Sequence, residues 1–296
     1  ERQQKHHHRC AELFCRYYGW DGEAGKLNRE DWDDFIQDRG DGSIDARGHS
    51  VAEADQESVG ARRVQEDLQA LRAVFNWAVQ ADLLDVNPVD SYPLPDADEP
   101  RRPRVSEERY RAMLEVASEV DWRFRVALVL ANETGHRSKA IRRLRWSDVN
   151  LQDDEPTVRW RGDEDKSGHE HVTPLTPPAV RVLREAQAER AGIGEAWVLP
   201  APKDPSEPVS RHLLRDWWYQ SEERADLEHV DGLGWHGLRR KFADELREVP
   251  LKDLADLGGW KTEQTILKCY QGSDLGSMRR AQEKRMTLRE GASAGE

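Results

Sequence analysis

The sequence is poor in cysteine, lacks a long apolar run and has no excess of positive charge. Its three cysteines, Cys10, Cys15 and Cys269, are too few to form a disulfide framework for 296 residues. No stretch approaches the roughly 18–20 uninterrupted apolar residues of a membrane-spanning helix, and no secretory signal pattern opens the chain. These absences exclude the small disulfide-rich class and favour a cytoplasmic protein with no membrane contact.

The charge is acidic overall, but the basic residues are segregated. Asp and Glu number 57 against 45 Lys and Arg, which gives a net charge of −12. A local field, rather than the total charge, steers a nucleic acid onto a protein. Basic side chains gather at 137–145, 236–241 and 279–289, whereas acidic side chains concentrate elsewhere. This pattern indicates a basic groove on an acidic body, and a salt-rich cytoplasm would also favour the surplus of carboxylates.

A proline-rich stretch divides the chain. Before it, the apolar residues Leu68, Leu71 and Phe75 recur at helical spacing within 65–84, and the whole first part reads as mostly helical. The stretch 93–103 then holds four prolines and no hydrophobic period, which is typical of an extended linker. We predict a helical domain at 1–92, a linker at 93–104 and a second domain at 105–296.

The second part predicts helices around a small sheet, so the expected fold class is mainly α with a small β-sheet. Ser106 is placed to cap a helix that reaches 116, and the apolar run 124–131 predicts a buried helix. Between 149 and 175, strand-forming residues flank Lys166-Ser167-Gly168, which indicates a hairpin or three-stranded sheet. Further helices are expected near 137 and at 179–191, 210–225, 236–248, 251–257 and 263–270.

Three separated clusters offer side chains that can handle a phosphate. Arg137 follows 134–136 at the expected start of a helix, where backbone N–H groups favour an anion. His236 and Arg239 lie three apart and share a helical face; guanidinium forks onto phosphate oxygens, and imidazole exchanges a proton near neutral pH. The Tyr270 phenol becomes a nucleophile only where cations stabilise its phenolate. Taken singly, each cluster is more often structural than catalytic.

The order of these clusters resembles the tyrosine recombinase (phage integrase) family across the second part of the chain. Thr134-Gly135-His136-Arg137 is similar to the first arginine box of that family, and 166–175 is similar to its hairpin lysine segment. His236-Gly237-Leu238-Arg239 matches the His-x-Leu-Arg box, Trp260 stands where the family has His or Trp, and Tyr270 stands at the nucleophile. The resemblance implies a helical core-binding domain followed by an α+β catalytic domain.

The resemblance implies a site-specific DNA recombinase or integrase that cleaves and rejoins strands through a 3′-phosphotyrosine intermediate. Tyr270 would attack the scissile phosphorus, Arg137 and Arg239 would clamp the non-bridging oxygens, and Lys166 would protonate the leaving 5′-oxygen. The implied catalytic set is Arg137, Lys166, His236, Arg239, Trp260 and Tyr270, and the expected DNA contacts are Lys139, Arg142, Arg143, Arg240 and Lys241.

Two departures from the family pattern change the tuning of the site, and a third concerns its register. The acidic residue often found three after the first arginine is Ala140 here, and Arg240 stands where a second histidine is common. The interval from Trp260 to Tyr270 is one residue longer than the commonest spacing. No tyrosine lies beyond Tyr270, and Tyr219 precedes the histidine box.

The expected partner is double-stranded DNA. The resemblance further implies a homotetramer on two DNA sites, a monomer or weak dimer without DNA, and a helix after Leu275 that docks onto a neighbouring subunit. The expected location is the cytoplasm, in association with the nucleoid. Three alternatives stay open: a DNA-binding relative without strand exchange, a type IB-like topoisomerase, and a purely structural helical protein.

We expect no cofactor and no metal. No carboxylate cluster accompanies the implied catalytic residues, so Mg²⁺ is not called for. The histidines at 6–8 with Cys10 and Cys15 form only a partial ligand set, because zinc sites pair CxxC-like spacings with further ligands. His169 and His171, near the predicted hairpin, are expected to be exposed or to contact phosphate rather than to bind a metal.

Overall fold

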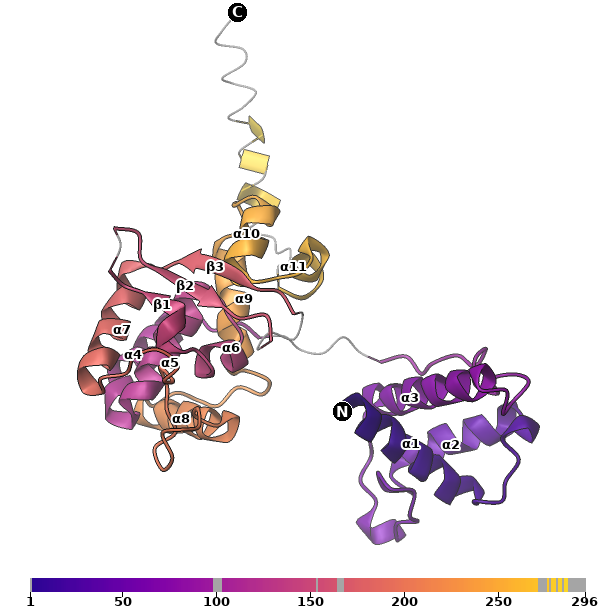
Figure 1. The fold of residues 1–296 in the computed structure, drawn as a ribbon. Helices are drawn as coiled ribbons and strands as arrows, with labels where there is room; N and C mark the ends of the chain where they lie inside the picture. Colours follow the sequence, from indigo (N-terminus) through magenta and orange to yellow (C-terminus); the bar gives the residue numbers. More distant parts are fainter. Residues whose placement is uncertain are drawn as a thin grey trace, which may run out of the picture. The chain divides into compact units, whose positions relative to one another are not determined.

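The computed structural model describes residues 2–97, 103–152, 154–163 and 168–270, with positions 276, 278–280, 282–283 and 285–286 beyond them. The chain forms two compact units, Glu1–Pro100 and Arg101–Glu296, and the division falls inside the predicted linker. Figure 1 shows the first unit in indigo to purple and the second in magenta to yellow. No helix among the described residues is both long enough and apolar enough to cross a bilayer. The predicted helix after Leu275 lies largely outside the described residues.

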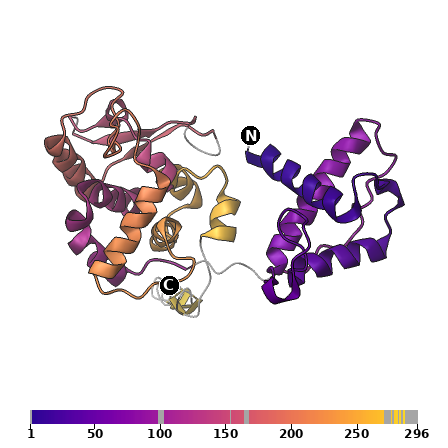
Figure 2. The same ribbon diagram turned by 90° about the horizontal axis from the view of Figure 1, so that it is seen from below.

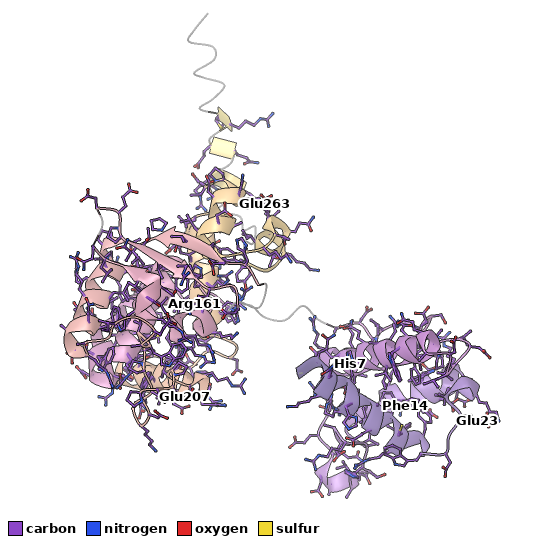
Figure 3. The ribbon with its side chains drawn as sticks, viewed as in Figure 1. His7, Phe14, Glu23, Arg161, Glu207 and Glu263 are labelled. Carbon is purple, nitrogen blue, oxygen red and sulfur yellow. The ribbon has the colours of Figure 1, made fainter. Side chains whose placement is uncertain are left out.

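The first unit is a helical bundle around an aromatic core. Phe14, which is labelled in Figure 3, stacks on Trp32 with ring centroids 5.1 Å apart and meets Phe75 edge to face at 5.4 Å. Asn28 begins the second helix with a capping box, in which its side chain and that of Asp31 satisfy backbone N–H groups. The helices are α1 (Arg2–Tyr18), α2 (Arg29–Asp41) and α3 (Ala61–Gln80), with 3₁₀ turns at Ala24–Lys26 and Glu53–Asp55.

The second unit is built on a buried helix, α5 (Trp122–Thr134), whose residues Phe124 to Ala131 are almost all in the core. Its all-round apolar sequence is typical of such a central position. Helices α4 (Glu107–Val120), α7 (Pro177–Glu189) and α9 (Trp235–Glu245) pack against it. Ser106 caps α4 as predicted, because its hydroxyl accepts the N–H of Arg109. The other helices are α6 (Ser138–Arg142), α8 (Arg211–Arg224), α10 (Leu251–Gly258) and α11 (Glu263–Cys269).

The predicted sheet is present and antiparallel, in the order β1 (Val149–Asn150), β2 (Thr157–Trp160), β3 (His171–Pro174). The register places Trp160 opposite His171. The strands lie along one margin of the unit with helices gathered beside them, and β3 runs next to α10 (Figures 1 and 2). The fold class, mainly α with a small β-sheet, is confirmed.

Candidate active site

Arg239 lies at the centre of the candidate site. It stands on α9 with 1% of its surface exposed, because Leu238 and Phe242 on the same helix face the core. Its Nη1 donates to the carbonyl oxygens of Gly135 at 2.5 Å and Gly258 at 2.6 Å. The guanidinium therefore joins two loops that are more than one hundred residues apart in the sequence.

Trp260 and Tyr270 surround the same guanidinium. The Arg239 Cζ lies 3.7 Å from the Trp260 ring centroid and 5.4 Å from that of Tyr270, both within cation–π range. The two rings meet edge to face at 5.1 Å. Tyr270 ends α11, which begins at Glu263 (Figure 3), and its N–H donates to the Ile266 carbonyl. Three predicted site residues from three chain segments are thus in contact.

Arg137 and His236 are close enough to Arg239 for their charges to interact. Arg137 is half-buried and precedes the five-residue helix α6 in extended geometry. His236 lies in the first turn of α9 and is exposed to solvent, although protein atoms gather around its ring. Protein packed around its ring lowers the pKa of His236, and the charges of Arg240, Arg239 and Arg137 lower it further. These cations favour a neutral imidazole that can accept a proton.

Lys166 lies outside the described residues. The strands that flank its segment are β2 and β3, so the predicted hairpin is present around it. Arg161, labelled in Figure 3, follows β2 and is bound by carboxylates: its Nε lies 2.8 Å from Asp148 and its Nη2 lies 3.1 Å from Glu195. Arg161 is therefore engaged in internal ion pairs.

Among the predicted DNA contacts, one side chain is exposed at the surface, and three arginines contact other atoms of the protein. Lys139 is exposed on α6, whereas the Arg142 guanidinium donates to the Val209 carbonyl at 3.0 Å. Arg143 lies over the Trp197 ring at 5.6 Å, and Arg240 donates to the Pro103 carbonyl at 3.0 Å.

Lys241 requires a correction. It is buried, and its Nζ lies 3.0 Å from Glu107, 2.7 Å from Glu245 and 3.0 Å from the amide oxygen of Asn132. A buried ammonium needs such partners to offset its lost hydration. Lys241 therefore ties α9 to α4 and α5 and is not a surface contact for DNA.

Two histidines without an assigned role lie beside the site. His136 is buried between Thr134 and Arg137, and its ring stacks on Trp160 at 3.7 Å. Its Nε2 lies 2.8 Å from Nε2 of His171, which opens β3. Burial holds the pKa of His136 well below its usual range, and Arg239, His171 and Arg137 reinforce this. Nothing in the sequence pattern indicates this pairing, because the two residues lie on separate elements.

One cluster with metal-ligand atoms is found among the described residues: His6, Cys10 and Asp67, with ligand atoms within 4.8 Å of one another. The Arg9 Nη2 contacts all three, at 3.3, 3.3 and 2.6 Å. Burial raises the pKa of the Cys10 thiol to about 12, and the Asp67 carboxylate adds to this. The Arg9 guanidinium already supplies a positive charge to these three side chains and takes up their ligand atoms.

Comparison with known proteins gives a consistent result. Residues 103–275 match the model of the phage integrase family. A putative integrase/recombinase of Haemophilus influenzae is 24% identical over 283 residues, which cover 93% of this chain and 82% of that protein. Among solved structures, a lambda integrase(75-356) dimer bound to a COC' core site has a TM-score of 0.70 at 17% identity, with 92% of this chain and 89% of that one covered. A lambda integrase tetramer bound to a Holliday junction has a TM-score of 0.69 at 17% identity, with 93% and 73% covered.

Proposed function

The chain belongs to the phage integrase family of site-specific tyrosine recombinases, and we propose that its five described site residues cleave and rejoin DNA through a phosphotyrosine. One observation carries the assignment: Tyr270 lies in a cluster with Arg239 and Trp260. A phenol reacts as a nucleophile where nearby cations stabilise the developing phenolate. The Arg239 guanidinium is such a cation, within cation–π range of the Tyr270 ring.

In the proposed step, one phosphorus–oxygen bond forms while another breaks. The Tyr270 oxygen bonds to the scissile phosphorus while the bond from phosphorus to the 5′-oxygen breaks, which leaves a 3′-phosphotyrosine and a 5′-hydroxyl. His236, held neutral by its surroundings, accepts the phenol proton, and Lys166 gives a proton to the leaving oxygen. A 5′-hydroxyl from the partner strand then reverses the step.

Arg137 and Arg239 clamp the non-bridging oxygens as charge develops on them. The Arg239 Nη1 is engaged with two backbone carbonyls, and the guanidinium is fixed before DNA arrives. Trp260 adds a donor: its indole Nε1 is buried and has no hydrogen-bond partner among the described residues. Such a group is costly unless a ligand or water satisfies it, and a bound phosphate oxygen would do so.

The proposed partner is double-stranded DNA, to which both the helical unit at 1–92 and the catalytic unit beyond the linker would bind. Integrases of this fold are known bound to DNA as a dimer and as a tetramer on a Holliday junction. We accordingly propose a homotetramer on two DNA sites and a monomer or weak dimer without DNA. Lys139, Arg142, Arg143 and Arg240 remain the proposed contacts, and the protein would act at the nucleoid.

A covalent-capture experiment tests the nucleophile. The protein is incubated with a nicked suicide duplex that carries its recombination site, and adducts that survive denaturation are resolved on a gel. We expect an adduct with the wild type and none with Tyr270→Phe, with duplex affinity unchanged within about twofold. Tyr219→Phe is the matched control, because Tyr219 is exposed on α8 and contacts, among the aromatic rings of the described residues, that of His229. An adduct that persists in Tyr270→Phe refutes the assignment.

The same protein on supercoiled plasmid separates the alternatives. Strand exchange between two sites is the expected result for a recombinase. Relaxation without exchange would indicate a topoisomerase, and duplex binding without an adduct would indicate a relative that does not cut.

A further inference from the structure

His136 and His171 lie where three segments of the candidate site meet. His136 belongs to the loop that ends at Arg137, and His171 is the first residue of β3. The His171 ring is half-buried and stacks at 5.1 Å on that of His136. The proposed mechanism uses neither residue.

The hydrogen bonds assign the protons of this pair. The His136 Nδ1 lies 3.0 Å from the Thr134 carbonyl, which can only accept, so Nδ1 carries the hydrogen. In the neutral ring, Nε2 of His136 is then the acceptor. His171 Nε2 must donate across the 2.8 Å contact. This bond joins the arginine loop to the hairpin strand.

The pair also supports the turn before Trp260. Gly259 has a φ of +63°, and a Cβ there would lie 2.5 Å from Cε1 of His171 and 3.2 Å from Nε2 of His136. The preceding residue, Gly258, gives its carbonyl to Arg239. The two imidazoles therefore lie directly under the turn that fixes Trp260 and Arg239.

We propose that His171 is a positioning residue for strand cleavage, acting through its hydrogen bond to His136. This inference rests on the proposed function. The bond aligns the loop before Arg137 with the turn before Trp260, so its loss displaces both phosphate-binding groups together. A displacement of about 1 Å at a reacting centre costs on the order of 100-fold in rate. The chemical step is affected, whereas DNA affinity is not, because most of that affinity comes from backbone contacts elsewhere.

The test compares two amides of different reach. In His171→Gln the side-chain amide takes the place of Nε2 and can donate to His136, whereas the amide of His171→Asn takes the place of Nδ1 and falls short. We expect His171→Asn to form the covalent adduct at least about 10-fold more slowly in a single turnover, and His171→Gln to recover most of the rate. Duplex affinity stays within about twofold for both variants.

Two controls complete the design. His212→Phe replaces an exposed imidazole on α8 and leaves the bond between His171 and His136 in place, so this variant should cleave at the wild-type rate. Thermal midpoints of each variant report folding. Equal adduct rates for the Gln and Asn variants overturn the inference, and so does a wild-type rate for His171→Asn. An absent adduct with the wild type instead refutes the proposed function itself.

Discussion

Arg239 shows how one side chain is both a structural and a site residue. Its Nη1 bonds to Gly135 and Gly258 fix the loops, and its planar face lies on Trp260. A lysine carries the same charge and its ammonium could donate to two carbonyls, but it has no planar face to lie on the Trp260 ring. The residue type is therefore determined by geometry as well as by charge.

Titration of His136 links the site to stability. Its pKa is lowered on folding, so the unfolded chain binds more protons than the folded chain once the pH falls below about 6.5, the ordinary value. The free energy of unfolding should then decrease as the pH falls. The titration of His136 contributes at most about 1.4 kcal/mol to this decrease for each pH unit. Above a pH of about 6.5, folding stability no longer depends on the titration of His136.

Urea denaturation between pH 7.5 and 5 measures this effect in the unit Arg101–Glu296. His136→Phe keeps a ring on Trp160 and removes the titration, so its slope against pH should be shallower than that of the wild type. His212→Phe, at an exposed position on α8, is the control and should leave the slope unchanged. Equal slopes for all three proteins would contradict the assignment.

The residues of the site were predictable to different degrees. Tyr270, Arg239 and Trp260 follow from motif order, and the structure brings them into contact. Lys241 was misread because a basic run does not reveal which members face inward, and the carboxylates that bury it come from other helices. The bond between His136 and His171 spans 35 positions, and no spacing rule reaches that far.

At the scale of elements, local signals predicted the helices well. Ser106 and Ser210 each accept a backbone N–H at the start of a helix, where their sequence positions indicate. The first unit differed: α3 ends at Gln80 and not at 84, because Asp82 adopts a φ of +55° and the Leu83 N–H donates back to the Ala78 carbonyl. This local capping turn decides where the helix ends, and the spacing of the apolar residues does not reveal it.

The turn between α10 and Trp260 gives a prediction of its own. Gly259→Ala adds a Cβ that meets the His171 ring at 2.5 Å, in a backbone conformation that is already unfavourable for alanine. We expect a lower thermal midpoint and an adduct rate at least about 10-fold slower than that of the wild type. The turn must shift, since both rings beneath it are held by hydrogen bonds.

Gly194→Ala is the matched control, because Gly194 has a φ of +58° and no atom within 4 Å of an added Cβ. It carries the same backbone strain without the clash. The adduct rate of Gly194→Ala should therefore equal that of the wild type. If both variants lose the same activity, strain alone explains the effect and the packing of the turn does not.

At the scale of the molecule, basic and acidic side chains must lie on different surfaces for the chain to bind DNA. A net charge of −12 repels phosphate on average, so binding depends on the few surfaces where cations prevail. Several basic residues are already neutralised internally: Arg159 and Arg161 pair with Asp148, and Arg39 pairs with Asp67. The cations left for DNA are fewer than the composition indicates.

Salt dependence measures how many of them bind. Each neutralised phosphate contributes about −0.9 to the slope of log K against log salt concentration, so we expect a linear decrease in duplex affinity between about 50 and 200 mM salt. Lys139→Gln removes an exposed cation beside the candidate site and should make the slope shallower by about one. Lys203→Gln removes an exposed cation from the loop before α8 and changes the net charge equally, from −12 to −13. Lys203→Gln changes the net charge but removes no proposed DNA contact. The slope of Lys203→Gln should therefore match that of the wild type. Identical slopes for both variants would mean that affinity follows total charge, and the basic stretch around Arg137 would then not be the DNA-binding surface.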